Sequence, residues 1–161
     1  MKVTFLFLTA VFLTFNACQT KKSSQDKEIP FTKHGELAFI KNNTSDTITT
    51  IDFELAGTER KRDLGLMYRH SLKTNHGMLF PFENEQPRSF WMRNTFLSLD
   101  IIYVDANFHI VSISDNTEPM SDLPVLSNVP AQYVVEVNAG FCLNNGIKPG
   151  DAISYTSCIP K

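Results

Sequence analysis

Short stretches in which apolar and polar residues alternate recur along most of this 161-residue chain. TITTIDFELA at residues 47–56 and AQYVVEVN at 131–138 show the pattern most clearly, and LSLDIIYVD at 97–105 is the longest apolar example. HGMLFPFE at 76–83 and RSFWMRN at 88–94 each have the composition of a short strand. A period of two residues is typical of a strand with one buried face. The pattern predicts a mainly β domain, a compact antiparallel β-sandwich or barrel-like fold.

Two short helices are predicted between the strands, over residues 58–70 and 139–145. Thr58 is a residue type that commonly caps the start of a helix, and Gly146 is one that commonly closes its end. Residues 115–130 contain three of the eight prolines of the chain and no periodicity. This segment is therefore predicted to be a long loop.

The N-terminus predicts where the protein is located. It begins with MKVTFLFLTAVFLTFNAC, in which Lys2 is followed by an apolar run from Val3 to Phe15. That run is too short for a membrane-spanning helix, which needs about 20 residues, so residues 1–17 are interpreted as a lipoprotein signal peptide. Cleavage would expose Cys18 for lipidation, and two or three acyl chains would anchor it permanently, whereas one chain binds only marginally. A plain secretory signal that leaves Cys18 as a free thiol is the alternative.

The rest of the chain is predicted to consist of a tether and one domain. Residues 18–33 are polar and aperiodic, as in a flexible tether, and residues 34–161 form a single β domain. Because Gln19 is not the Asp that favours retention in the inner membrane, we expect a bacterial outer-membrane lipoprotein that faces the periplasm. The formal net charge of −2 creates no basic field, so no nucleic acid is expected as a partner.

Six short motifs occur in the order found in the family called domain of unknown function 192 (DUF192). They are GLMYR, GMLFPF, SFWMRNT, LDIIYVD, YVVEVNAG and GIKPGD. The chain resembles this family over about residues 48–156. The resemblance implies a compact, mostly β fold of sandwich type, often secreted or lipid-anchored, so a lipoprotein-anchored member is expected. It implies no established activity, and no cofactor is expected.

Polar residues on two predicted strands are candidates for a ligand-binding site. Glu136 and Asn138 share one face of their strand, while Asp100 is flanked by apolar residues and needs a partner such as Arg93 or Arg62. An aromatic side chain beside Arg, Asn and carboxylates suits a polar ligand with an apolar side, such as a sugar. The candidates are Trp91, Arg93, Asn94, Thr95, Asp100, Glu136 and Asn138.

A structural role for these residues is the alternative. Trp91 would then fill the core, and Arg93 would form an ion pair with Asp100 or Glu136. In both interpretations Trp91 and Met92 point to opposite sides of the extended chain, and one of these sides packs against the core.

Few residues suggest other chemistry. The four histidines have no metal-ligand spacing, so no metal site is expected. Asp100 and Glu136 as the acid and base of a hydrolase would rest on residue type alone. Cys142 and Cys158 form a disulfide in an oxidising compartment, or remain two free buried thiols.

Three functions therefore stay open. The first is a non-catalytic binding or accessory module of the cell envelope, tethered to the membrane through Cys18, for a small polar or carbohydrate-like ligand. The second is an envelope hydrolase that uses Asp100 and Glu136. The third is a structural module that docks an envelope protein through the loop at 115–130. The first is favoured, and no catalytic residue is assigned, because the chain has a lipoprotein signal and no convincing catalytic set.

Overall fold

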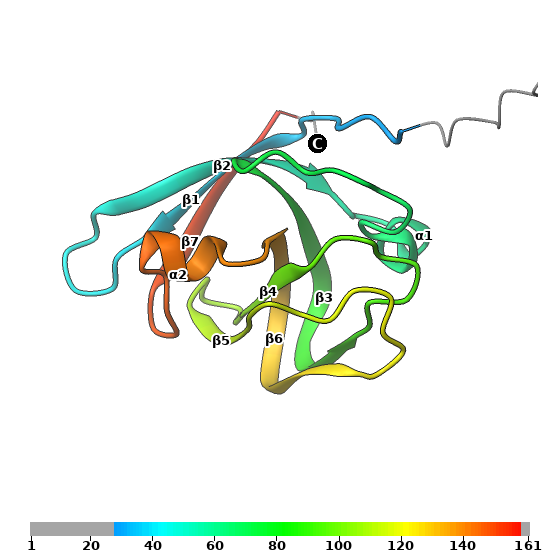
Figure 1. Cartoon of the computed structure of the whole chain (residues 1–161). Helices are drawn as coiled ribbons and strands as arrows, with labels where there is room; N and C mark the ends of the chain where they lie inside the picture. Colours follow the sequence, from blue (N-terminus) through cyan, green and yellow to red (C-terminus); the bar gives the residue numbers. More distant parts are fainter. Residues whose placement is uncertain (1–27, 159–161) are drawn as a thin grey trace, which may run out of the picture.

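The computed structural model describes residues 28–158 and contains seven strands and two short helices (Figure 1). The strands are β1 (Gly35–Ile40), β2 (Thr47–Leu55), β3 (His76–Phe90), β4 (Leu99–Val104), β5 (Ile110–Ser114), β6 (Val125–Asn138) and β7 (Ala152–Ser157). The helices are α1 (Glu59–Leu64) and α2 (Phe141–Asn145). The prediction of a mainly β domain with two short helices is confirmed.

All seven strands belong to one curved sheet, in the order β5-β4-β6-β3-β2-β1-β7. Neighbouring strands run antiparallel, with the exception of β2 and β3, which pair in parallel after a crossover through α1. The curvature brings the two edges of the sheet together at an isolated bridge between His109 and Ala152. Apart from this bridge the edge strands do not pair, so the sheet is not closed into a barrel.

Both faces of the central strands are covered by buried side chains. Along β4, Ile102 and Val104 pack into one apolar cluster, whereas Ile101 and Tyr103 pack into another. Successive side chains of a strand point to opposite faces, so these two clusters lie on opposite sides of the sheet. We call the first the inner cluster, because it also holds β1, β7 and α2 residues, and the second the outer cluster.

Two predicted loop and strand boundaries are corrected by the pairing of β6. The strands expected at 76–83 and 88–94 are one strand, β3, because β6 pairs with both of its halves. The register is irregular between Pro81 and Gln86, where the apolar pattern of the sequence is also interrupted. The loop expected at 115–130 is shorter than predicted, since β6 already begins at Val125.

The helix expected at 58–70 is also shorter than predicted. Thr58 caps it as expected, because its hydroxyl accepts a hydrogen bond from the Lys61 amide. The helix then ends after Leu64, because Gly65 takes a positive φ of 48° and leaves the helical conformation. The second helix agrees better with the sequence, since Gly146 closes α2 in the left-handed conformation.

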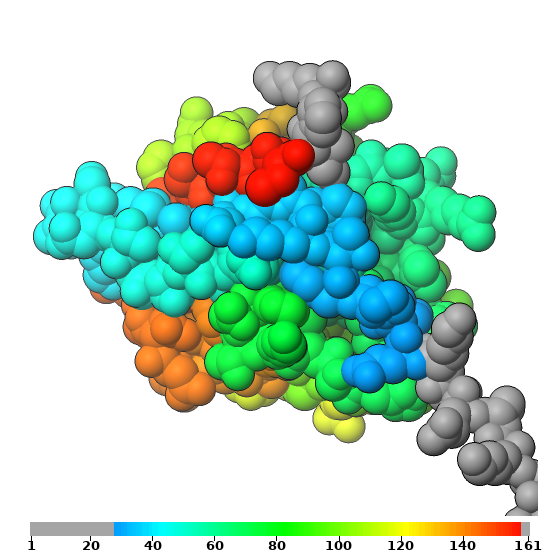
Figure 2. Space-filling model, turned by 90° about the horizontal axis from the view of Figure 1, so that it is seen from above, coloured from blue at the N-terminus to red at the C-terminus, as the bar shows by residue number. Residues whose placement is uncertain are grey.

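The last residues of the predicted tether lie against the domain. Figure 2 shows the darker blue residues before β1 on the surface of the domain, toward the green residues near the start of β3. Phe31 stacks on His76 with a centroid distance of 3.7 Å, and the Thr32 amide donates a hydrogen bond to Glu54. Residues 1–17 and Cys18, which carry the predicted signal and lipidation site, lie outside the described residues.

Candidate functional site

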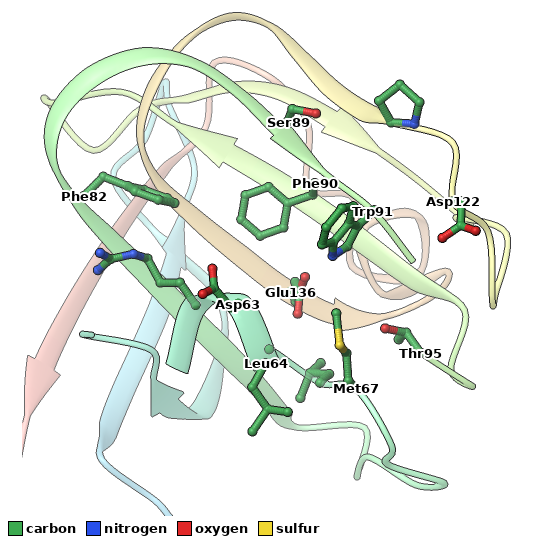
Figure 3. Close-up of a pocket in the computed structure, with 14 residues that line it drawn as sticks. Asp63, Leu64, Met67, Phe82, Ser89, Phe90, Trp91, Thr95, Asp122 and Glu136 are labelled. Atoms are coloured by element: carbon green, nitrogen blue, oxygen red, sulfur yellow. The ribbon is translucent and has the colours of Figure 1, made fainter. Parts of the chain in front are cut away.

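A cavity of about 340 Å³ opens on the side of the sheet that carries the outer cluster. Its walls come from the turn that follows α1, from the end of β3 and from the loop before β6 (Figure 3). The carboxyl group of Glu136 lies between Phe90 and Trp91 on one side and Leu64 and Met67 on the other. The Glu136 carboxyl group therefore lies among apolar side chains of the cavity lining, which also includes the polar residues Arg62, Asp63, Ser89, Thr95 and Asp122.

The turn after α1 is shaped by Gly65. Its φ of 48° is strained for any residue with a side chain, and a Cβ at this position would lie 3.7 Å from Oε2 of Glu136. The glycine lets the chain leave α1 sharply, so that Leu66 enters the core while Leu64 and Met67 line the cavity. The short helix thus serves to position one wall of the cavity.

Glu136 lies two residues before the end of β6, between Met78 of β3 and Ile101 of β4. Its side chain is only 5% exposed, and among the described residues its Oε2 has no hydrogen-bond partner. Burial raises the pKa of this carboxyl from 4.5 to about 8, because removal from water penalises the charged form. Glu136 is therefore a neutral carboxylic acid at neutral pH, and it can donate or accept a hydrogen bond at the cavity floor.

Trp91 lies at the mouth of the cavity with 47% of its surface exposed. The alternative in which Trp91 fills the core is wrong, because that role belongs to Met92, which is 1% exposed. The two side chains point to opposite sides of the chain, as expected. Because Met92 packs into the core, the indole ring of Trp91 lies on the opposite side of the chain, at the cavity mouth.

Arg93 belongs to the rim of the cavity and not to its floor. Its guanidinium carbon lies 4.3 Å from the Trp91 ring centroid, and its Nε forms an ion pair with Asp122 at 2.5 Å. The predicted ion pair of Arg93 with Asp100 or Glu136 is therefore wrong. Both partners of the observed pair are exposed, so its contribution to stability is small, about 0–1 kcal/mol.

Asn94 and Thr95 hold the turn that follows Trp91. The Asn94 side-chain amide donates a hydrogen bond to the Tyr68 hydroxyl at 2.9 Å, and the Asn94 carbonyl accepts one from the Tyr68 amide. Thr95 is buried, lines the cavity and donates its hydroxyl to the carbonyl of Arg93. These bonds attach the indole-bearing segment to the turn after α1, so the two walls of the cavity are linked.

Asp100 lies on the opposite face of the sheet from Glu136, next to α2. Its carboxylate accepts backbone hydrogen bonds from Asn116 at 3.0 Å, Gly140 at 3.1 Å and Cys142 at 2.9 Å. The expected arginine partner is thus replaced by three main-chain amides, two of them at the start of α2. Because Asp100 and Glu136 face different sides, they cannot act on one substrate as an acid and base pair.

Asn138 also has a structural position in this fold. Its side-chain amide donates to the carbonyls of Leu72 and Lys73 at 3.0 and 3.1 Å, which fixes the segment before β3. Of the seven candidates, three line the cavity, namely Trp91, Thr95 and Glu136. Arg93 contacts its rim, Asn94 supports its wall, and Asp100 and Asn138 hold backbone elsewhere.

The cysteines at 142 and 158 are free thiols. Cys142 is buried at the start of α2 in the inner cluster, and burial together with the nearby Asp100 raises the pKa of its thiol. Cys158 is exposed after the end of β7. Of the two alternatives drawn from the sequence, the structure therefore has the one without a disulfide, although one thiol is exposed and not buried.

Several cavity residues could not be found from strand parity. Asp63, Leu64 and Met67 belong to α1 and its following turn, and Asp122 belongs to the loop before β6. Gly65 in the motif GLMYR is the sequence signal that could have identified the turn, because a glycine after a short helical segment commonly ends it.

Within residues 28–158, no group of three or more His, Cys, Asp and Glu side chains is arranged to hold a metal ion. In the same part of the chain, no helix has the length and apolar character needed to cross a membrane.

Replacing Glu136 with Gln is expected to stabilise the protein, and more so as the pH rises. Above about pH 4.5 the unfolded chain releases the Glu136 proton while the folded chain retains it up to about pH 8, so this residue lowers the free energy of unfolding progressively across that window. A neutral amide avoids this cost. Free energies of unfolding from urea titrations should differ by less than about 1 kcal/mol near pH 5 and by roughly 4 kcal/mol near pH 8. A loss of stability in the Gln variant at both pH values would contradict the placement of an unpartnered carboxyl here.

The chain matches the family model of domain of unknown function 192, described as "Uncharacterized ACR", over residues 40–155. No curated protein matches it. A solved structure from Sinorhizobium meliloti 1021, described as a candidate transcription regulator, is 33% identical, and the match covers 78% of this chain and 98% of that chain with a TM-score of 0.72. A protein of unknown function from Novosphingobium aromaticivorans DSM 12444 is 34% identical, over 74% of this chain and 83% of that chain, with a TM-score of 0.69. The chain therefore belongs to the DUF192 family.

Proposed function

We propose that this protein is a lipid-anchored, non-catalytic module of the bacterial cell envelope that binds a small polar ligand with an apolar side, such as a sugar. The cavity above Glu136 carries this proposal, because an unpartnered buried carboxyl group lies beneath an aromatic wall. Pockets for small ligands commonly combine apolar walls with a few polar groups that fix orientation. The volume of about 340 Å³ is within the range of such pockets.

The cost of keeping Glu136 in place supports a binding role. A buried polar atom without a partner lowers stability, and functional sites often retain such groups at a cost to the fold. A ligand hydroxyl could form a hydrogen bond with the Glu136 carboxyl group while the apolar face of the ligand contacts Trp91 and Phe90. Asp100, the other carboxyl group of the hydrolase alternative, lies on the opposite face of the sheet, which favours binding over hydrolysis by that acid and base pair.

The proposed anchor is tested by replacing Cys18 with Ser. The apolar segment at residues 3–15 followed by this cysteine supports lipidation. Because the acyl chains would supply the attachment to the membrane, the Ser variant should move from the membrane fraction to the soluble fraction. Fractionation followed by immunoblotting measures the change, with Cys158→Ser as the matched control that should stay in the membrane fraction. A Cys18→Ser protein that still sediments with membranes would refute the anchor.

The binding role is tested by the fluorescence of Trp91, which is the only tryptophan of the chain and lies at the cavity mouth. Titration of the Cys18→Ser protein with glucose, N-acetylglucosamine or glucosamine should change its emission in a saturable way. A ligand that binds only the folded state also raises the melting temperature, which provides a second readout. If none of the three changes either quantity at millimolar concentration, the proposed ligand class is wrong.

A docking role for the segment around the predicted loop is the second candidate. Met120 and Leu123 are 52% and 74% exposed, and Leu126 and Val129 at the start of β6 are also exposed. Exposed apolar side chains that lie close together often mark protein interaction surfaces. In this case Leu123→Asp should abolish co-purification of an envelope protein and leave sugar titrations unchanged. The description of one relative as a candidate transcription regulator does not extend to this chain, whose net charge of −2 is unsuited to DNA.

A further inference from the structure

The charged groups around the cavity are predominantly acidic. Arg62 is the one guanidinium that lines it, whereas Asp63, Asp122 and Glu136 contribute three carboxyl groups. The Asp122 carboxylate is already paired with Arg93. This leaves Asp63 to balance Arg62, so a carboxylate formed at Glu136 would have no counter-charge left among the lining residues, and a cationic ligand would supply one.

The aromatic rings near the cavity already have cations over their faces. Arg88 lies 3.8 Å and Arg62 lies 5.3 Å from the ring centroid of Phe82, and Arg93 lies over Trp91. The face of an aromatic ring attracts cations because its quadrupole is negative there. The ring of Phe90 also lines the cavity and instead packs edge-on against Phe80, Phe82 and Tyr103. The rings of Phe82 and Trp91 therefore already pair with guanidinium groups, and Phe90 offers an apolar surface for the body of a ligand.

The floor of the cavity has an acceptor that no described residue satisfies. Oε2 of Glu136 is buried and lacks a hydrogen-bond partner within residues 28–158, and the Glu136 side chain lines the cavity (Figure 3). Hydrogen bonds to a charged donor are roughly twice as strong as neutral ones, and a buried carboxylate is stable only when it is paired. A positively charged donor would both form a strong hydrogen bond to the Glu136 carboxylate and neutralise its charge.

We propose that the ligand carries a protonated amino group, and that this ammonium forms an ion pair with Glu136 at the cavity floor while the body of the ligand contacts Trp91 and Phe90. This inference rests on the proposed binding function and narrows it from polar ligands in general to compact amines, including amino sugars.

Binding of an ammonium group requires the carboxyl group of Glu136 to lose its proton. The free protein holds Glu136 as the neutral acid, so association of an ammonium releases the carboxyl proton to solvent and leaves a carboxylate paired with the ammonium. The ionisable groups that face this position are Tyr103 of β4, Arg62 and Asp63 of α1, and Asp122 of the preceding loop. Tyr103 stays neutral, because burial raises the pKa of its hydroxyl. Proton release near neutral pH is thus assigned to Glu136, because burial raises the pKa of its carboxyl to about 8.

The experiment compares matched pairs of ligands by Trp91 fluorescence of the Cys18→Ser protein. Glucosamine is paired with N-acetylglucosamine, and cyclohexylamine with cyclohexanol, because each pair differs chiefly in the positive charge. The amine of at least one pair should bind about tenfold or more tightly than its neutral partner. Its apparent Kd should rise about tenfold for each pH unit below 7.5, since protonated Glu136 competes with the ammonium.

Variants separate the ion pair from general effects on the protein. Glu136→Gln should lose the preference for the amine and its pH dependence, while Glu83→Gln, the same change at an exposed position of β3, should keep both. Calorimetry in buffers of different ionisation enthalpy should detect release of about one proton per amine bound near pH 7. Equal affinity for the neutral partner, or tighter binding at lower pH, would overturn this inference and leave the binding function intact. Absence of any response to all four compounds would overturn both.

Discussion

Replacing Asp100 with Asn is expected to lower the free energy of unfolding by roughly 3–5 kcal/mol. The side chain is fully buried, and its two oxygens accept hydrogen bonds from the amides of Asn116, Gly140 and Cys142. An Asn side chain retains one acceptor and turns an NH₂ group toward amides that are themselves donors, so at least one backbone N–H loses its partner. The start of α2 and the segment after β5 should loosen together.

Urea unfolding of the variant measures this loss, and Asp46→Asn is the matched control. Asp46 is exposed in the turn before β2, so the same substitution there should change stability by no more than about 0.5 kcal/mol. Hydrogen exchange should also report faster exchange at the amides of Gly140 and Cys142. A variant as stable as the parent would show that Asp100 does not hold these amides, and would return it to the candidates for a ligand site.

Replacing Arg69 with Met is expected to have a similarly large effect, roughly 3–5 kcal/mol. Arg69 and Glu54 are each 6% exposed, and Nη2 of Arg69 lies 2.5 Å from Oε2 of Glu54. Without the guanidinium, the Glu54 carboxylate stays buried with only the hydrogen bond from the Thr32 amide. The cost comes from an uncompensated charge and not from the lost attraction alone.

A double-mutant cycle distinguishes that cause from lost packing. Adding Glu54→Gln to the Met variant removes the buried charge, so the double variant should be more stable than the sum of the single changes predicts. Arg60→Met, at an exposed position of α1, is the matched control and should be nearly neutral. Additive losses in the cycle would indicate that the two side chains do not interact in the folded protein.

The strands were predictable where their pattern depends on local chemistry. Leu97, Leu99 and Ile101 alternate with Ser98 and Asp100, and this alternation indicates β4. Gly146 likewise closes α2 where the sequence indicated a C-cap. Strand β4 and the end of α2 depend on side chains within a few residues of one another, so the sequence alone was sufficient to predict them.

The strand partners were not predictable in the same way. β3 extends through Pro81 and Pro87 because β6 supplies partners on both sides of the irregular stretch. Val134 and Val135 of β6 point to opposite faces of the sheet and are both buried, because an apolar cluster covers each face. Which segments cover each face depends on the whole chain, so local alternation could not show that both faces are buried.

Sequence parity placed Glu136 on the face opposite Val135 and Val137, and it placed Trp91 opposite Met92; both depend only on the alternation of side chains along an extended backbone. The tertiary structure alone decided that the face of Glu136 is covered, because the turn after Gly65 and the loop holding Asp122 come from distant parts of the chain. It also separated Asp100 from Glu136, since pairing of β4 with β6 sets Asp100 beside Val137 and turns its carboxylate toward α2. A carboxyl group takes its partner and its pKa from whatever surrounds it in space, and for these two residues the surroundings are built by segments that no local pattern connects.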